Sequence, residues 1–259
     1  MLVREVTARV SITYPRKEFD ILSNALQSAG WLMPEAMPRK LNLGSGRDWR
    51  EDYFNVDVVP SWEPDAVLDF NLPLPTGQPL ATSRFGNVVL ENNSFDEILA
   101  LNVLQQIRSL TTTMTSCLNL LRVGGLFRIS VPYDLSWGAW EDPAHVRAFN
   151  ERSWLYYTDW FWQMGWREAR FDIAHFDLRL SPIGQALTKQ QVKGEDLARC
   201  PRAIEQMRVA LRKRWLTEAE REQVGAFLKR ENHAADPLVA SLDVSSIGGN
   251  VAPGPATAL

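Results

Sequence analysis

Cysteine, histidine and long apolar runs are scarce in this sequence of 259 residues. The two cysteines, Cys117 and Cys200, are far apart and outside any metal-ligand spacing, so a disulfide scaffold is excluded and we expect no metal site. No stretch reaches the roughly 18 consecutive apolar residues of a membrane span. The first residues include charged side chains and no apolar run of the length that a signal peptide has. We therefore expect no membrane partner and a cytoplasmic location.

An excess of basic charge is also lacking. The formal net charge is −3, whereas a domain that binds nucleic acid usually carries a basic face or stripe. Nucleic acid is therefore a disfavoured partner. The hydrophobic fraction of 45% and the charged fraction of 23% are typical of globular proteins, and the length favours one large core with additions.

Short apolar segments, separated by loops or helical patterns, predict an open, doubly wound α/β sheet whose strands are mostly parallel. Between the last two of these segments, residues 103–121 have helical periodicity, and residues 122–125 are expected to form a turn. The predicted strands are residues 40–43, 54–59, 66–70, 95–101 and 126–131.

The pattern changes after the fifth predicted strand. Six of the ten tryptophans fall between residues 137 and 166, and a helix is expected from Ser153 to Met164, with Gly165 as its stop. Alternating residues over 166–174 and 175–180 predict two antiparallel strands that complete the sheet. Trp154, Tyr157 and Phe161 have the spacing of a buried helical stripe, although a lid that grips a substrate is the alternative.

The C-terminal third is rich in charge. Residues 196–232 are expected to form one or two helices, with Ile204, Met207, Leu211 and Trp215 as a buried stripe. The basic run 208–214 is interpreted as a solvated helix face, with phosphate binding as the alternative. The chain is thus divided into an N-terminal helical cap (1–38), a core (39–185) with a tryptophan-rich insertion (134–165), C-terminal helices (186–235) and a disordered tail (236–259).

The strongest chemical signal is the glycine loop Gly44-Ser45-Gly46, directly after the first predicted strand. Glycines there let the backbone approach a ligand at the edge of an open α/β sheet. The third glycine of a dinucleotide fingerprint would stand at Trp49, so NAD and FAD are disfavoured. Asp57 and Asp69 end the next two strands, where carboxylates can accept hydrogen bonds from a ribose and an adenine. The alternative is a plain turn followed by two loop-capping aspartates.

These motifs, in this order, resemble those of the class I S-adenosylmethionine-dependent methyltransferases. More narrowly, the chain is similar to a small bacterial group with the motifs L-N-L-G-x-G, N-V-D, D-x-x-x-x-L-P and F-D-x-I-x-A-x-x-V-L. The matching residues are 41–46, 55–57, Asp69 with the following prolines, and 95–104. The resemblance spans about residues 38–180. It implies a Rossmann-like, seven-stranded sheet with an antiparallel last strand, and S-adenosylmethionine as the cofactor.

The resemblance also implies site residues. Gly44 and Gly46 would flank the methionine part of the cofactor, Asp57 the ribose, Asp69 and Phe70 the adenine, and Asn102 the sulfonium. The full set of expected cofactor contacts is Leu43, Gly44, Ser45, Gly46, Asp57, Val58, Asp69, Phe70, Asn102 and Val103. Two features depart from the group: Gln105-Gln106 replaces a frequent Glu-His pair, and the crossover from Gly44 to Asp57 leaves little room for a helix.

The acceptor side is expected just after the fifth strand. His145 is the candidate general base, oriented by Asp142; a structural histidine bonded to a backbone carbonyl is an equal alternative. Tyr133 would also take part in catalysis. We expect substrate contacts from Asp134, Trp137, Trp140 and Arg147.

The sequence therefore predicts a methyltransferase that acts on an O, N or S atom of a small molecule. A methyltransferase of RNA or protein, and a nucleoside-binding module without chemistry, are the alternatives. A homodimer is possible, and the sequence does not name the acceptor.

Overall fold

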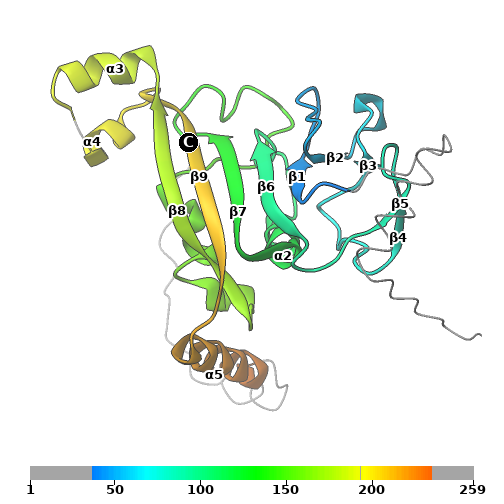
Figure 1. Cartoon of the computed structure of the whole chain (residues 1–259). Coiled ribbons are helices and arrows are strands. Elements are labelled where there is room, and N and C mark those ends of the chain that lie inside the picture. Colours follow the sequence, from blue (N-terminus) through cyan, green and yellow to red (C-terminus); the bar gives the residue numbers. More distant parts are fainter. Residues whose placement is uncertain (1–36, 193, 235–259) are drawn as a thin grey trace, which may run out of the picture.

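The computed structural model describes residues 37–192 and 194–234, with side chains described up to residue 230. Within these ranges the chain forms a seven-stranded sheet and a separate two-stranded hairpin (Figure 1). The predicted N-terminal helical cap, up to residue 36, and the predicted tail 236–259 lie outside the described residues.

The large sheet is mixed, with four parallel pairings on one side and an antiparallel strand near the other edge. Its spatial order is β3-β2-β1-β6-β7-β9-β8; β9 runs antiparallel to both β7 and β8. This confirms the predicted fold class, including the antiparallel last strand. The strands are β1 (Lys40–Leu43), β2 (Phe54–Asp57), β3 (Ala66–Val67), β6 (Phe95–Leu101), β7 (Leu121–Pro132), β8 (Ala169–Leu180) and β9 (Ile204–Trp215).

The winding of the chain reverses at β1. From β1 the chain adds β2 and β3 in one direction, and then crosses over to add β6 and β7 in the other. In open α/β sheets the crevice beyond the carboxyl ends of two such central strands is where ligands bind. The topology therefore points to the loops after Leu43 and Leu101.

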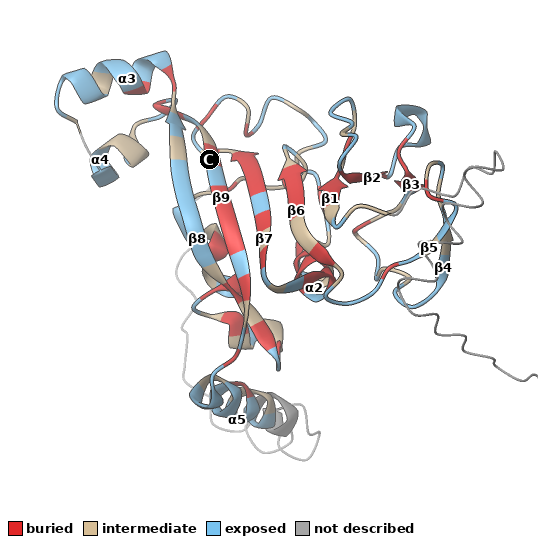
Figure 2. Cartoon of the chain, viewed as in Figure 1, coloured by how far each residue is buried: buried red, intermediate tan, exposed pale blue. Residues whose placement is uncertain are grey.

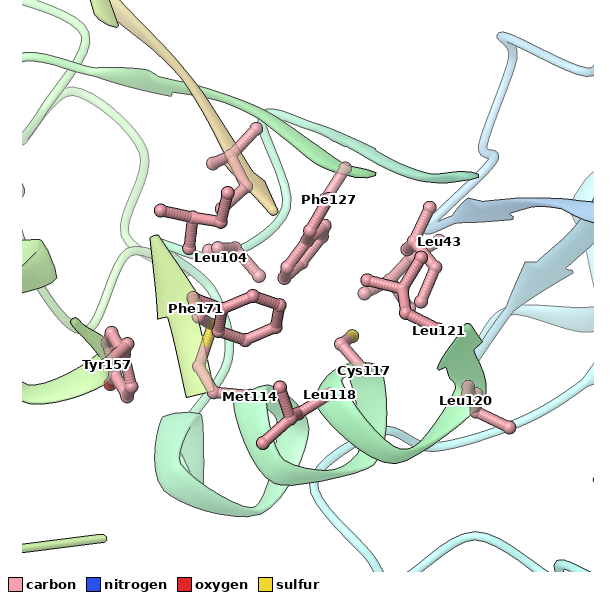
Figure 3. Packing of buried hydrophobic residues seen from close by; sticks show 14 of the residues in the cluster. Leu43, Leu104, Met114, Cys117, Leu118, Leu120, Leu121, Phe127, Tyr157 and Phe171 are labelled. Carbon is pink, nitrogen blue, oxygen red and sulfur yellow. The ribbon is translucent and has the colours of Figure 1, made fainter. Parts of the chain in front are cut away.

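One face of the sheet packs on α2 (Leu110–Leu120) and on aromatic side chains (Figure 3). Met114 and Cys117 of α2 are fully buried, and Phe127 of β7 and Phe171 of β8 meet with ring centroids 6.3 Å apart. The red residues of Figure 2 follow this core along the central strands. Burial raises the pKa of the Cys117 thiol, which behaves as a small apolar side chain.

Short elements surround the sheet. A hairpin at one side consists of β4 (Pro79–Ala81) and β5 (Asn87–Val89), and two helices, α3 and α4, lie between β8 and β9 beyond the end of the sheet (Figure 1). Their bounds are α3 (Pro182–Lys189) and α4 (Gly194–Arg199); the others are η1 (Pro60–Trp62), η2 (Glu151–Tyr157), η3 (Phe161–Met164) and α5 (Glu218–Ala234).

The predicted helical stripe through Ile204, Met207, Leu211 and Trp215 is wrong, because this segment is strand β9. The predicted region of C-terminal helices is therefore interrupted by a strand of the sheet. Met207, Val209, Leu211 and Lys213 are buried at every second position, as in a strand with one covered face, and one of these residues is a lysine. Lys213 is 4% exposed, and its Nζ donates to the Leu121 carbonyl at 2.8 Å.

Other boundaries also differ from expectation. Residues 166–180 do not form two strands: β8 is one strand, whose ladder with β9 shifts register between Ile173 and His175. The expected helix 153–164 is replaced by η2 and η3, and Asn150, not Ser153, is the N-cap of η2. Gly165 does end η3 in the left-handed conformation, with φ +69°.

Two further differences concern the middle of the chain. The expected turn 122–125 belongs to β7, and the helix predicted over 103–121 begins only at Leu110. The chain between β3 and β6, for which no strand was predicted, contains the hairpin β4–β5. Within the described ranges, no helix combines the length and apolar character that crossing a bilayer requires.

Candidate functional site

The glycine loop after β1 is held against the end of β2. The backbone N–H groups of Gly44 and Ser45 both donate to the Val56 carbonyl, at 2.9 and 3.0 Å. Gly44 and Gly46 have φ angles of +65° and +45°, which L-residues other than glycine adopt at a cost. The sequence places glycine at these positions because the chain leaves β1 through a left-handed turn.

Gly44 is also in close contact with Val103, the second residue after β6. A Cβ atom at Gly44 would lie 2.5 Å from Cγ2 of Val103, so no larger residue fits without a shift. This contact joins the loops that follow the two central strands. Two segments of the predicted cofactor site, residues 43–46 and 102–103, are therefore adjacent in the structure.

Asp57, the last residue of β2, is hydrogen-bonded to the glycine loop. Its Oδ2 accepts from the N–H of Gly46 at 2.9 Å, and its Oδ1 accepts from the N–H of Val59 at 2.9 Å. The residue is 7% exposed. A carboxylate offers about four lone-pair directions, so two are left for donors of a ligand. Val58, also predicted to contact the cofactor, is exposed beside it.

Asp69 lies at the same edge of the sheet, one strand farther out. The N–H of Leu68 donates to the Asp57 carbonyl at 3.0 Å, which places the two aspartates on neighbouring segments. Oδ1 of Asp69 accepts from the backbone and side-chain nitrogens of Asn71, at 2.8 and 2.7 Å. Asp69 thus caps its own turn, as the alternative interpretation expected, while its Oδ2 accepts no hydrogen bond from the described residues.

Phe70 does not lie where the resemblance implies. Its side chain is 2% exposed and belongs to the hydrophobic core, and its carbonyl accepts a bond from Oγ1 of Thr113 at 2.7 Å. The ring is therefore packed inside the protein and is not presented to the crevice as a surface for adenine.

Residues 44–53, all of them described, form no helix, as the short crossover suggested. Buried amide side chains hold this segment instead. Nδ2 of Asn55 donates to the carbonyls of Arg50 and Tyr53 at 2.8 and 3.0 Å, and its Oδ1 accepts from Nδ2 of Asn42 at 3.1 Å. Asn42 also donates to the carbonyl of Asp48 at 2.7 Å. The two asparagines of the sequence motifs therefore shape the glycine loop.

Asp65 completes this network and was not anticipated from the sequence. It is 2% exposed, and its Oδ2 accepts from the backbone N–H of Asn55 at 2.7 Å. The guanidinium of Arg84 pairs with it at 2.9 Å. A buried carboxylate needs such a partner, so the hairpin β4–β5 that carries Arg84 also supports the site.

Asn102 directly follows β6 and has a φ angle of +55°, a left-handed conformation uncommon outside glycine. Its N–H donates to the Ser130 carbonyl at 2.8 Å, and its Oδ1 accepts from Nε2 of Gln206 at 3.0 Å. Asn102 is exposed at the carboxyl edge of the sheet. The glycine loop follows the neighbouring strand β1, and Asn102 also lines a cavity.

That cavity, which we call the acceptor cavity, has a volume of about 670 Å³. It lies between the end of β6, the loop after β7, and the segment that carries α3 and the start of β9. Of the predicted site residues, Asn102, Trp137, Asp142 and His145 line it. The other lining residues used below are Gln105, Ser136, Glu141, Arg179, Ser181, Arg202 and Glu205.

His145 faces this cavity with a side chain that is 7% exposed. Its Nδ1 is 3.1 Å from the Ala139 carbonyl, and because a carbonyl only accepts, Nδ1 carries the hydrogen. In the neutral ring Nε2 is then the basic nitrogen. Nε2 lies 3.8 Å from Oδ2 of Asp142, too far for a hydrogen bond, so the Ala139 carbonyl and not Asp142 fixes the ring.

Tyr133 cannot act as expected, because its hydroxyl is used inside the protein. The residue is 3% exposed and donates to Oε2 of Glu151 at 2.9 Å. Burial and the bond to Glu151 raise the pKa of Tyr133, so the phenol keeps its proton at neutral pH and does not serve as a base. We therefore remove Tyr133 from the candidate catalytic residues.

The predicted substrate residues divide into two groups. Trp137 is 64% exposed and lines the acceptor cavity. Among the described residues, Asp134, Trp140 and Arg147 do not line it. Oδ2 of Asp134 accepts from Nδ2 of Asn150 at 3.0 Å, and Arg147 donates to the Arg108 carbonyl at 2.7 Å. Trp154, Tyr157 and Phe161 are buried, as the core interpretation predicted.

No protein-family model and no curated protein matches the chain. Solved structures with similar folds include an S-adenosylmethionine-dependent methyltransferase from Mesorhizobium loti, with 16% identity and a TM-score of 0.42 over 73% of this chain and 96% of the other. One from Archaeoglobus fulgidus has 12% identity and a TM-score of 0.41, over 74% and 93%. The cyclase SpnF has 14% identity and a TM-score of 0.43, over 76% and 82%. Similarity of this extent assigns neither a family nor an activity to the chain.

Proposed function

We propose that this chain binds S-adenosylmethionine at the carboxyl ends of β1, β2 and β3 and transfers its methyl group to an O, N or S atom of a small molecule. The observation that carries the proposal is the hydrogen bond between Asp57 and Gly46, at 2.9 Å. This bond joins a glycine loop, whose backbone a ligand can approach closely, to a buried carboxylate that has lone pairs not used by the protein.

The chemistry of these groups fits an adenosyl group without phosphates. Asp57 can accept from both hydroxyls of a ribose, and Asp69 stands one strand farther along the same edge, within the stretch that an attached base would span. The described loop 44–53 contains no helix N-terminus, so the backbone donors that usually bind a pyrophosphate are lacking. Oγ of Ser45 is buried without a partner among the described residues, which a ligand would supply.

The acceptor cavity adjoins this crevice at Asn102. When bound, S-adenosylmethionine would supply a methyl group on a sulfonium, to which a nucleophile of the acceptor bonds in line as the carbon–sulfur bond breaks and S-adenosylhomocysteine leaves. In this proposal the cavity walls hold the acceptor. Where the nucleophile carries a proton, Nε2 of His145 is placed to take it, because Nδ1 is already committed to the Ala139 carbonyl.

Two measurements test the proposal. Calorimetry with S-adenosylmethionine and S-adenosylhomocysteine should show binding, and NAD in the same buffer should show none. A panel of metabolites with a labelled methyl donor should then yield a labelled product. Binding without any product would instead support the nucleoside-binding module, and labelling of RNA or protein would identify a macromolecular acceptor.

A further inference from the structure

The wall of the acceptor cavity formed by the α3–α4 segment is rigid. The N–H of Ser181 donates to the Ala203 carbonyl at 3.0 Å, and Oγ of Ser181 donates to the Arg202 carbonyl at 2.6 Å. A Cβ atom at Gly184 would lie 2.0 Å from the carbonyl oxygen of Ala203, so the first turn of α3 packs directly on this backbone. Arg202 is therefore carried on a fixed frame.

The conformation of Arg202 is itself unusual. Its φ angle is +64°, which costs on the order of 1 kcal/mol or more for a residue with a side chain. Its N–H donates to the Leu135 carbonyl at 2.9 Å, which links the α3–α4 segment to the loop after β7. The backbone strain is therefore held by bonds on both sides, and it directs the side chain towards Trp137.

The guanidinium of Arg202 lies over the indole ring of Trp137, with Cζ 3.5 Å from the ring centroid. Stacking occupies the face of the guanidinium and leaves its N–H groups, which point outward in the plane, for a ligand. Among the described residues, no carboxylate or carbonyl accepts a hydrogen bond from this side chain. Arg202 is exposed, and a planar guanidinium without an ionic partner is suited to bidentate binding of a carboxylate or phosphate.

The other charged groups that line the cavity are one ion pair and two carboxylates. Arg179 pairs with Glu205 at 3.3 Å, and Asp142 lies 3.8 Å from the ring of His145. Glu141 is exposed at the rim. Arg202 is thus the cavity cation that lacks an anionic partner in the described part of the chain.

Two polar atoms deeper in the cavity wall also lack partners among the described residues: Oε1 of Gln105 and Oγ of Ser136. Gln105 is 2% exposed and Ser136 is 9% exposed, and both line the cavity. Buried polar atoms are nearly always satisfied, so a ligand group is the natural partner. An amide oxygen accepts only, which requires a hydroxyl or amine on that ligand.

We propose that the acceptor cavity takes a small molecule with a carboxylate or phosphate group, which binds Arg202, and with a hydroxyl or amine that donates to Gln105. Such a ligand is the methyl acceptor only if the methyl-transfer function proposed above holds. The binding itself requires only the cavity.

Ligand-detected NMR titrations of the full chain test this class directly. The probes are glycerol 3-phosphate, glycerate and glycerol, which share a polyol skeleton and differ in the anionic group. We expect at least one anionic probe to bind about tenfold or more tightly than glycerol, as for a hydrogen bond to a charged group. The affinities of glycerol 3-phosphate and glycerate then show whether the cavity prefers a phosphate or a carboxylate.

Variants locate the effect. Arg202→Gln should remove the preference for the anion, and Gln105→Leu should weaken every probe that binds. Arg199→Gln is the matched control, because Arg199 is an exposed arginine on α4 that pairs with Glu195. Unchanged thermal midpoints show that the variants fold. Anions that bind no better than glycerol, or an Arg202→Gln variant that binds like the parent, overturn the proposal.

Calorimetry with S-adenosylhomocysteine on the same samples separates this proposal from the proposed function. If the nucleoside binds and the anionic probes show no preference for Arg202, the substrate class is wrong and the proposed function stands. If the probes bind through Arg202 and the nucleoside does not bind, the cavity is an anion site and the methyl-transfer function is wrong.

Discussion

The carboxylate of Asp57 accepts a hydrogen bond from the N–H of Gly46 at 2.9 Å, across the ends of two neighbouring parallel strands. Eleven positions separate the two residues, and the buried amides of Asn42 and Asn55 hold the segment between them. Side-chain hydrogen bonds, and not a helix, therefore order the connection between β1 and β2 at this site.

The close contact between Gly44 and Val103 predicts a steric penalty. Gly44→Ala should destabilise the protein through both its positive φ and overpacking, the second term costing about 1–3 kcal/mol. Gly77→Ala is the control, since Gly77 has a φ of +73° and nothing within 4 Å. Urea unfolding of both variants should show the larger loss at Gly44, with part of it recovered by adding Val103→Ala. Equal losses at the two glycines would contradict the contact.

His145 is predicted to act on the acceptor and not on the cofactor. His145→Ala should lower turnover by about 10²–10⁴-fold, the usual contribution of a general base, and leave the affinity for S-adenosylmethionine unchanged. The control is His175→Ala, an exposed histidine on β8. If the His145 variant turns over as fast as the parent, His145 is not the general base and its role is structural.

The buried pair of Asp65 and Arg84 is predicted to be important for stability. Arg84→Met removes the partner of a carboxylate that is 2% exposed, and should cost about 3–5 kcal/mol in the free energy of unfolding. Arg122→Met, at an exposed pair with Asp96, should cost about 1 kcal/mol or less. Denaturant titrations compare the two, and similar small losses would show that Asp65 is solvated.

Glu220 gives a prediction for the dependence of stability on pH. Hydrogen bonds from Arg214, and also from Thr217 and Arg170, hold the pKa of this carboxyl far below its ordinary value of 4.5. A folded-state pKa below the unfolded one stabilises the protein above pH 4.5, and this stabilisation is lost as the pH falls further. Glu220→Gln should therefore be less stable than the parent at neutral pH. The difference should shrink in acid, and a constant difference would contradict the assignment.

Much of the fold could be predicted because its signals are local. Short apolar runs predict β1, β2 and β6, with glycine after the first and aspartate at the end of the second, and the motif order predicts how they neighbour each other. Strand β9 was missed because Ile204, Met207 and Leu211 also have helical spacing. In the structure this strand pairs with β7 and β8, and the buried Lys213 is accepted there because the Asn93 side chain and the Leu121 carbonyl both bind its ammonium, each at 2.8 Å.

The site was predicted in part for the same reason. The glycine loop, Asp57 and His145 stand beside strand ends that the sequence marks, whereas Tyr133 follows a strand in the same way but points inward to Glu151. Arg202 and Asp65 depend on contacts with residues far away in sequence, Trp137 and Arg84 among them. Such contacts leave no periodic signal, so only the structure reveals them.

Calorimetric titration of S-adenosylmethionine into the parent chain and into Asp57→Ala tests the central claim most directly, with Asp52→Asn, at an exposed pair with Lys40, as the control. The account predicts that the parent and the control bind alike, and that Asp57→Ala loses about 1–3 kcal/mol of binding free energy because ribose hydroxyls lose their acceptor. A parent chain that does not bind the nucleoside, or an Asp57→Ala variant that binds it as tightly as the parent, would contradict it.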